Sequence, residues 1–211
     1  MKRIQEALNE RILILDGPMG TMIQNENLKE EDYRGKKFES SSILLKGNND
    51  ILNLTQEKII YDIHTKYLAA GADIIETNTF NSTKTSQLDY KCEDFSYDLN
   101  FSGGKIARKA VDDFLIKNPN ETKYVAGVLG PTNRTCSMSP DVNNPGFRNI
   151  SFDELYSDYE KSSEALIEAG VDVIMVETIF DTLNAKAALS SIEGAFKKTK
   201  KNVPIMISAT I

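Results

Sequence analysis

Acidic residues follow several apolar runs in this sequence, and their positions indicate where a ligand could bind. Asp16, Glu76 and Glu177 each end a run of apolar residues with the composition of a buried strand. A carboxylate at such a point has to be paired or hydrated, and parallel α/β folds bring the carboxyl ends of their strands to one ligand-binding mouth. Converging carboxylates suit a ligand with an ammonium group, and backbone N–H groups beside them suit its carboxylate. An amino-acid-like ligand is therefore predicted.

Other kinds of chemistry are disfavoured. The Gly-Gly-Lys at 103–105 lacks the rest of a Walker loop, so a phosphate ligand is not expected. His64 is the only histidine, and we expect it on the polar side of a surface helix, where it forms neither a metal pair nor a catalytic triad. Cys92 and Cys136 are too few for a disulfide framework and have no nearby Cys or His partner, which argues against a zinc site built from this chain alone.

The composition describes one ordinary globular unit. The 211 residues are 40% hydrophobic and 27% charged, and 25 basic against 31 acidic side chains give a formal charge of -6. Because the basic residues are scattered and not interleaved with aromatic ones, neither nucleic acid nor a membrane surface is expected as a partner. No apolar run is long enough for a signal peptide or a membrane span, so the cytoplasm is the expected location.

The elements that would position these residues alternate along the chain. Runs rich in Ile and Val, apolar on both faces, predict buried parallel strands at 12–15, 72–79, 124–129, 171–178 and 204–211. Apolar stripes and capping signals predict helices between them at 55–70, 101–117, 151–169 and 181–198. Ser82, Thr83 and Asp181 suit the N-caps of helices.

Five strands fit either a doubly wound sheet or part of an eight-stranded barrel. The last run, at 204–211, has no helix after it, which favours a truncated barrel over a finished doubly wound domain. Two long loops, at 20–53 and 131–150, interrupt the alternation, and loops of this length in a compact α/β unit usually carry function. No low-complexity linker is present, so we expect one domain.

Long runs at these same strand ends resemble the homocysteine-binding module of cobalamin-dependent methionine synthase, within the homocysteine S-methyltransferase family. The matching runs are residues 15–24, 46–50, 71–83, 126–134, 139–143 and 177–186. Betaine–homocysteine methyltransferase shares the Asp-Gly start and the fourth-strand Glu, whereas the Gly-Pro-Thr-Asn-Arg and Asp-Thr-Leu-Asn-Ala-Lys runs point to the cobalamin enzyme. Pro18 departs from the pattern, since it stands where the family often has a second Gly and removes one N–H.

The resemblance implies a (β/α)8 TIM barrel, truncated here after about the fifth strand, with residues 1–211 as the N-terminal part of the homocysteine-binding domain. It further implies that Asp16 and Glu177 hold the ammonium of homocysteine. Backbone N–H groups near Gly17, Thr77 and Asn78 would hold the carboxylate.

The family's zinc ligands are three cysteines late in the barrel, and the resemblance places them beyond Ile211. Cys92 and Cys136 do not match them, so no metal ligand or catalytic residue is assigned here and the 211 residues alone are expected to be inactive. The resemblance also implies methylcobalamin as the methyl donor, with cobalamin-binding and methyltetrahydrofolate-binding modules on the same polypeptide. Two alternatives remain open: a stand-alone zinc-dependent homocysteine S-methyltransferase that uses betaine or S-methylmethionine, and a non-catalytic fragment.

Overall fold

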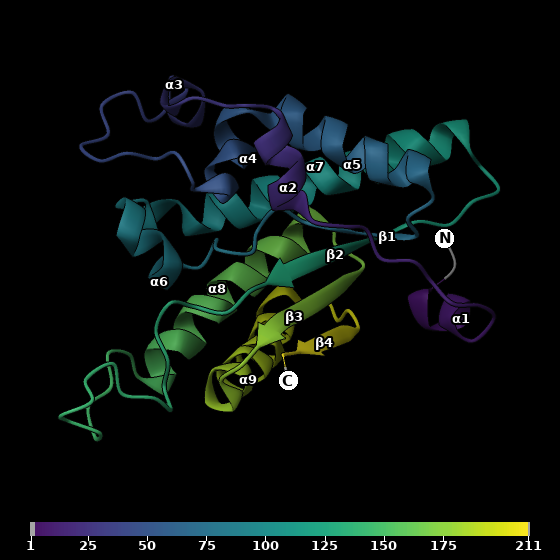
Figure 1. Ribbon diagram of the computed structural model, residues 1–211. Helices are drawn as coiled ribbons and strands as arrows, with labels where there is room; N and C mark the ends of the chain where they lie inside the picture. Colours follow the sequence, from purple (N-terminus) through teal and green to yellow (C-terminus); the bar gives the residue numbers. More distant parts are fainter. Residues whose placement is uncertain (1–2, 211) are drawn as a thin grey trace.

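The computed structural model describes residues 3–210 as an α/β fold with a parallel sheet (Figure 1). The strands lie in chain order, each parallel to its neighbours: β1 (Ile74–Glu76), β2 (Tyr124–Leu129), β3 (Val173–Ile179) and β4 (Ile205–Ala209). This arrangement, in which consecutive strands are neighbours, is that of barrel staves, whereas a doubly wound sheet reverses its strand order part-way.

Long helices connect the strands and cover one face of the sheet. These are α5 (Glu57–Ala70), α7 (Ser96–Lys117), α8 (Phe152–Ala169) and α9 (Thr182–Thr199). The α7, α8 and α9 helices pack on β2 and β3, and the core between these layers contains Val125, Leu129, Ile174 and Val176 from the strands (Figure 1). None of the helices in residues 3–210 is both long and apolar enough to cross a bilayer.

The opposite face of the sheet carries a second apolar cluster. Ile74, Tyr124 and Val173 belong to it, together with Ile4 and Ala7 from the short helix α1 (Ile4–Leu8). Because strand side chains alternate between faces, this second set forms the inward-facing rows of the sheet. The α1 helix lies at the N-terminal ends of these rows, away from the end that carries the acidic residues.

The predicted first strand is wrong in extent. The run at 12–15 pairs with β1 only through an isolated parallel bridge between Leu15 and Ile74. Ile12 is 85% exposed and Ile14 is 55% exposed, so only one face of the run is buried, with Leu13 and Leu15 packed on the inner cluster. The Ile14 N–H donates to the Asp73 carboxylate over 2.9 Å rather than to a neighbouring strand. The last predicted strand is seen as β4, and Ile211 lies outside the described residues.

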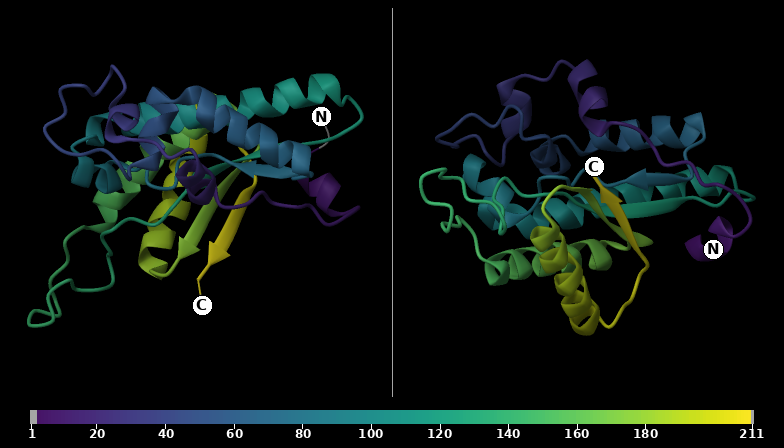
Figure 2. Two further views of the ribbon diagram at one scale, coloured as in Figure 1. Left: turned by 45° about the horizontal axis from the view of Figure 1, so that its top comes forward. Right: turned by 60° about the horizontal axis from the view of Figure 1, so that its bottom comes forward.

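The predicted loop at 20–53 is also partly wrong, because it contains short helices. They are α2 (Met19–Asn25), α3 (Glu30–Arg34), η1 (Asn49–Ile51) and α4 (Leu52–Thr55). Ile23, Tyr33 and Ile51 from this segment form a core of their own with α5 and α7. Three further short elements, α6 (Lys84–Gln87), η2 (Leu88–Tyr90) and η3 (Glu93–Phe95), lead into α7. The loop at 131–150, in contrast, has neither helix nor strand and extends away from the body in both views of Figure 2.

Capping residues mark most helix boundaries as predicted, and Thr83 caps α6, whereas the prediction for Ser82 is wrong because its hydroxyl donates to Asp50. The Ser151 hydroxyl accepts a hydrogen bond from the Glu154 N–H, and the Glu154 carboxylate accepts one from the Ser151 N–H, which is the predicted capping box of α8. Gly71 and Gly170 end α5 and α8 with φ values of 106° and 96°, a backbone conformation that favours glycine. Asp181 caps α9 by accepting from the N–H groups of the next turn.

Candidate substrate-binding site

Two of the acidic residues continue the inward-facing rows of the sheet. Glu76 ends β1 two residues after the inward-facing Ile74, and Glu177 lies in β3 two residues after Met175, which belongs to the same inner cluster. Since side chains in a strand repeat every second residue, both carboxylates point to the inner face at the carboxyl ends of their strands. Both are partly buried.

Asp16 joins them from the segment that follows the isolated bridge. Its Oδ2 accepts a hydrogen bond from the Glu76 backbone N–H over 3.1 Å. Its Oδ1 is buried and has no hydrogen-bond partner within residues 3–210. The structure thus brings Asp16 and Glu76 into direct contact, and one Asp16 oxygen remains available for a donor from a ligand.

The three carboxyl groups influence one another's pKa values. Burial raises the pKa of Asp16 to about 8, and the nearby charges of Glu76 and Glu177 also raise it. Burial, followed by the charge of Glu177, raises the pKa of Glu76 to about 7. Burial likewise raises the pKa of Glu177. No basic side chain of residues 3–210 forms an ion pair with any of the three. A bound cation would therefore stabilise the ionised carboxylates.

A local backbone distortion sets the position of Glu177. Thr178, the next residue, has a φ of 54°, and the pairing of β3 with β4 shifts register between Val176 and Ile179. A β-branched residue in this left-handed region is an outlier that stores strain, and bulges of this kind concentrate beside functional sites. No signal in the sequence indicated it, because the run 171–178 has the composition of a regular strand.

A side chain at Gly17 would be crowded by Tyr67. A Cβ at Gly17 would lie 3.1 Å from two atoms of the Tyr67 ring, Cε1 and the hydroxyl oxygen. Tyr67 reaches the site from α5, and its hydroxyl donates to the Pro18 carbonyl over 3.3 Å. The Gly17 N–H has no acceptor within the described part of the chain. It can therefore donate to a ligand carboxylate.

Thr77 and Asn78 differ in what they offer to a ligand. The Thr77 N–H donates to the Ala126 carbonyl over 2.9 Å, and its hydroxyl accepts from the Val128 N–H, so Thr77 already joins β1 to β2. The Asn78 side chain is likewise engaged, because it donates to the Asn49 carbonyl and to Asn53 Oδ1. The backbone N–H of Asn78, however, has no acceptor among residues 3–210.

A buried network of polar side chains supports the segment after β1 that contains Asn78. It was not predicted from the sequence. Asp50 is 2% exposed and accepts hydrogen bonds from the Asn81 N–H and the Ser82 hydroxyl, each over 2.8 Å. Burial raises its pKa to about 6. Asn53 donates to the Asn78 carbonyl over 2.7 Å. The run at 46–50, noted only as a family motif, was the available signal for this network.

His64 does not lie on a polar surface, so that prediction is wrong. The side chain is fully buried, and neither ring nitrogen has a hydrogen-bond partner in the described structure. Burial lowers the pKa of His64 to about 4, so the imidazole is neutral at physiological pH. Because α5 packs against both α7 and α2, more of its surface is buried than the single apolar stripe predicted.

The donor set of the described residues does not fit a metal ion. Cys92 and Cys136 are buried free thiols, and the Cys92 Sγ lies 3.2 Å from the Tyr90 carbonyl oxygen. Residues 3–210 contain no group of three His, Cys, Asp or Glu side chains placed to hold a metal. No zinc chemistry can therefore be derived from these residues.

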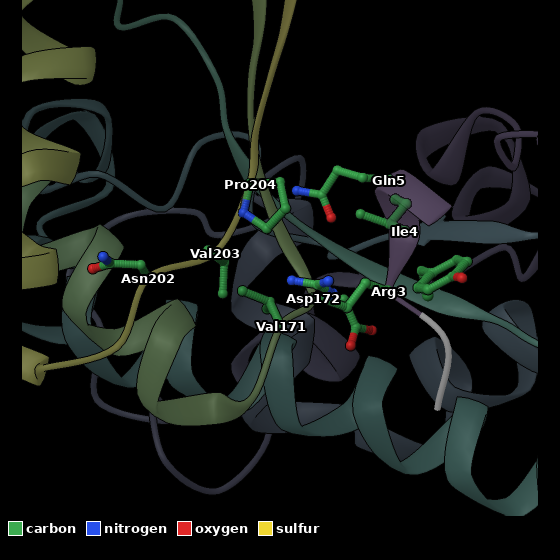
Figure 3. Close-up of a pocket in the computed structure, with 9 residues that line it drawn as sticks. Arg3, Ile4, Gln5, Val171, Asp172, Asn202, Val203 and Pro204 are labelled. Atoms are coloured by element: carbon green, nitrogen blue, oxygen red, sulfur yellow. The ribbon is translucent and has the colours of Figure 1, made fainter. Parts of the chain in front are cut away.

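A hollow lies at the opposite, N-terminal ends of the strands (Figure 3). Ile4, Val171, Asp172 and Pro204 contribute to its lining. The Asp172 carboxylate is already engaged, since it accepts from the Val125 N–H over 2.8 Å and pairs with Arg108 over 2.9 Å. This end of a barrel contributes to stability rather than ligand binding. The acidic residues described above lie at the other end.

Comparison with known proteins identifies the family. The family model for homocysteine S-methyltransferase matches residues 13–211. The chain is similar in structure to the homocysteine methyltransferase MmuM from Escherichia coli. Against its oxidized form, the TM-score is 0.69 at 22% identity, covering 94% of this chain and 63% of that chain. Against its metallated form, the TM-score is 0.70 at 22% identity, covering 92% and 63%.

The chain thus spans less than two thirds of the length of that enzyme. The likeness identifies the four-stranded parallel sheet as a truncated TIM barrel, as predicted. The family match extends over nearly all of the sequence, including every strand described above, and the chain therefore belongs to the homocysteine S-methyltransferase family.

Proposed function

We propose that this chain binds the amino-acid end of homocysteine at the mouth formed by Asp16 and Glu177. The two carboxylates accept hydrogen bonds from the ammonium, and the free N–H groups of Gly17 and Asn78 donate to the carboxylate. Thr77 contributes by joining β1 to β2 beneath this turn. The observation that carries the proposal is the convergence of buried carboxyl groups that have no basic partner in the described chain.

In the finer form of the proposal, the chain is the first part of a methionine synthase barrel. Methylcobalamin would donate the methyl group to the homocysteine sulfur, giving methionine, and other modules of the polypeptide would bind cobalamin and methyltetrahydrofolate. The runs at 130–134 and 181–186 support this form, because they resemble the cobalamin enzyme. The chain's own residues hold the amino-acid end and so orient the sulfur toward the donor.

A stand-alone homocysteine S-methyltransferase using S-methylmethionine or betaine is the second candidate. It is favoured by the structural likeness to MmuM, a homocysteine methyltransferase. In either case we place the zinc-binding cysteines outside residues 1–211, because the described residues offer no suitable set. We treat residues 1–211 as part of one barrel domain. Its unpaired buried cysteines favour the reducing cytoplasm.

Binding can be tested by titration calorimetry of the protein with L-homocysteine and with 4-mercaptobutanoate, which lacks only the amino group. Each charge-assisted hydrogen bond contributes about 1.5–3 kcal/mol, and the analogue loses both bonds to the ammonium, so it should bind at least about 150-fold more weakly. Equal affinity for both compounds would overturn the ammonium site. Offering methylcobalamin, S-methylmethionine and betaine separately as donors distinguishes the two forms of the proposal.

A further inference from the structure

The candidate site contains one more carboxylate than the proposed ammonium contacts require. Glu76 lies between Asp16 and Glu177 in the order of the strands, and its side chain points to the same inner face. Its carboxylate accepts no hydrogen bond from residues 3–210, although its backbone N–H donates one to Asp16 Oδ2. A group in this position is available to a ligand and is not part of the internal bonding of the fold.

Three carboxylates around one ammonium carry an excess of negative charge. Like charges at close range disfavour simultaneous ionisation, particularly where burial has removed water. The groups that face the cluster are the three acids themselves and the phenol of Tyr67 from α5, whose pKa is raised by burial and by the charge of Asp16. No arginine, lysine or histidine of the described chain compensates them.

We propose that Glu76 is the third residue of the ammonium site, and that the Asp16–Glu76 pair holds a proton that leaves when an α-amino acid binds. This inference rests on the proposed amino-acid-binding function. In the step, a carboxyl O–H bond breaks, the proton passes to solvent, and the carboxylate left behind accepts a hydrogen bond from the incoming ammonium. No oxidation or reduction occurs.

The titration behaviour of the free site agrees with this geometry. Asp16 and Glu76 have pKa values of about 8 and about 7, so one carboxyl group is substantially protonated near neutral pH. A bound ammonium stabilises the ionised forms and lowers both values. Amino-acid affinity should therefore rise with pH below about pH 8, by up to about tenfold per pH unit where one proton is released.

The experiment uses L-methionine, because it has the amino-acid end of homocysteine but no thiol that could release a proton of its own. Calorimetric titrations at pH 7.5 in phosphate and in Tris, which differ in ionisation enthalpy, count the protons released. We expect the observed binding enthalpies to differ between the two buffers. Divided by the difference in buffer ionisation enthalpy, this difference should correspond to a substantial fraction of one proton released per methionine bound. The isosteric variant Glu76→Gln should release fewer protons, whereas Glu31→Gln, which removes an exposed carboxylate on α3, should behave as the wild type.

The possible outcomes distinguish a failure of the proton release from a failure of the proposed amino-acid binding. If neither methionine nor homocysteine binds, the proposed function is wrong. If methionine binds with equal enthalpy in both buffers, or if its affinity is flat between pH 6 and pH 8, the proton release is wrong and the binding function stands. If Glu76→Gln releases as many protons as the wild type, Glu76 has no part in it. Should that variant fail to fold, the pH dependence of the wild type still tests the proton release, and Glu76→Asp, which keeps a carboxylate but withdraws it from the site, tests the part of Glu76 by the same proton count.

Discussion

Asp181 accepts two hydrogen bonds from Ser137 on one carboxylate oxygen, from the backbone N–H over 3.1 Å and from the hydroxyl over 2.6 Å. Its other oxygen caps α9 through the N–H groups of Leu183 and Asn184. One side chain therefore ties the long loop at 131–150 to the end of β3, four residues after Glu177.

Replacing Asp181 with Ala should lower the free energy of unfolding by about 0.5–2 kcal/mol from the lost cap alone. Ser137→Ala removes only the hydroxyl bond and should cost less. Urea denaturation gives the two free energies, and limited proteolysis should show faster cleavage within 131–150 for Asp181→Ala. Cleavage at the wild-type rate would show that the loop is held by other contacts.

The Asp181 hydrogen bonds should also make the loop sensitive to acid. Although burial opposes ionisation, the bonds from Ser137 and from the α9 backbone lower the pKa of Asp181 below its ordinary value. Its stabilising contribution is therefore present above the unfolded pKa and is lost as the pH falls through the lower folded value. The proteolysis rate of the loop, measured with a protease active in acid, should rise over this range in the wild type and stay unchanged in Asp181→Ala.

Asp16→Asn and Glu177→Gln should weaken homocysteine binding by about 10- to 150-fold each, because each removes a charge-assisted acceptor for the ammonium. In the folded protein, the pKa of Asp16 is raised above its unfolded value, so ionised Asp16 destabilises the fold as the pH rises toward about 8. Asp16→Asn should thus melt no lower than the wild type at pH 8. Unchanged affinity together with a lowered melting temperature would assign both residues to structure instead.

Gly17→Ala should weaken homocysteine binding, because the added Cβ would lie 3.1 Å from the Tyr67 ring and displace the backbone that carries the free N–H. Gly20→Ala is the matched control, since its nearest neighbour would be an Asn49 side-chain atom at 3.8 Å. Gly20 lies within α2, where Ala is a better helix former than Gly. Equal affinities of the two variants, measured by calorimetry, would contradict the close approach at Gly17.

Buried His64 should make the fold less stable in mild acid. In the folded protein its pKa is about 4, well below the ordinary value of 6.5. The contribution of the neutral imidazole to the free energy of unfolding is therefore fully present above pH 6.5. It declines as the pH falls from 6.5 toward 4, by up to about 3 kcal/mol. His64→Leu should show a smaller loss of unfolding free energy between pH 7.5 and pH 5 in urea titrations. An equal loss in both proteins would mean that other groups cause the acid sensitivity.

Local sequence patterns correctly predicted the strands and helices that carry a clear local signal, either a continuous apolar run or capping residues at the ends of a helix. The strand at 124–129 was predicted to the residue because all six of its residues are buried and none is polar enough to interrupt the apolar run. Helix α8 was equally clear, since Ser151 and Glu154 form a capping box and Gly170 ends the helix. Placing Glu76 and Glu177 on one mouth needed only the general rule for parallel strands.

What the sequence could not supply depends on contacts between distant segments. His64 is buried by packing on two sides of α5, which a single helical stripe does not reveal. Ile12 and Ile14 have strand-like side chains, yet they remain exposed because the segment pairs with β1 at only one residue. Thr178 adopts a positive φ that its side chain opposes, so tertiary structure and not local preference decides its conformation.

The left-handed backbone conformation at Thr178 makes this residue a site where substitution should raise stability. A search for more thermostable variants would favour Gly or Asn at this position, because either residue adopts a positive φ with less strain. Asn keeps this backbone conformation and so keeps Glu177 in place, whereas Gly also lets the backbone beside Glu177 adopt other conformations. Thermal screening alone would not separate these two outcomes, so ligand affinity has to be measured alongside stability.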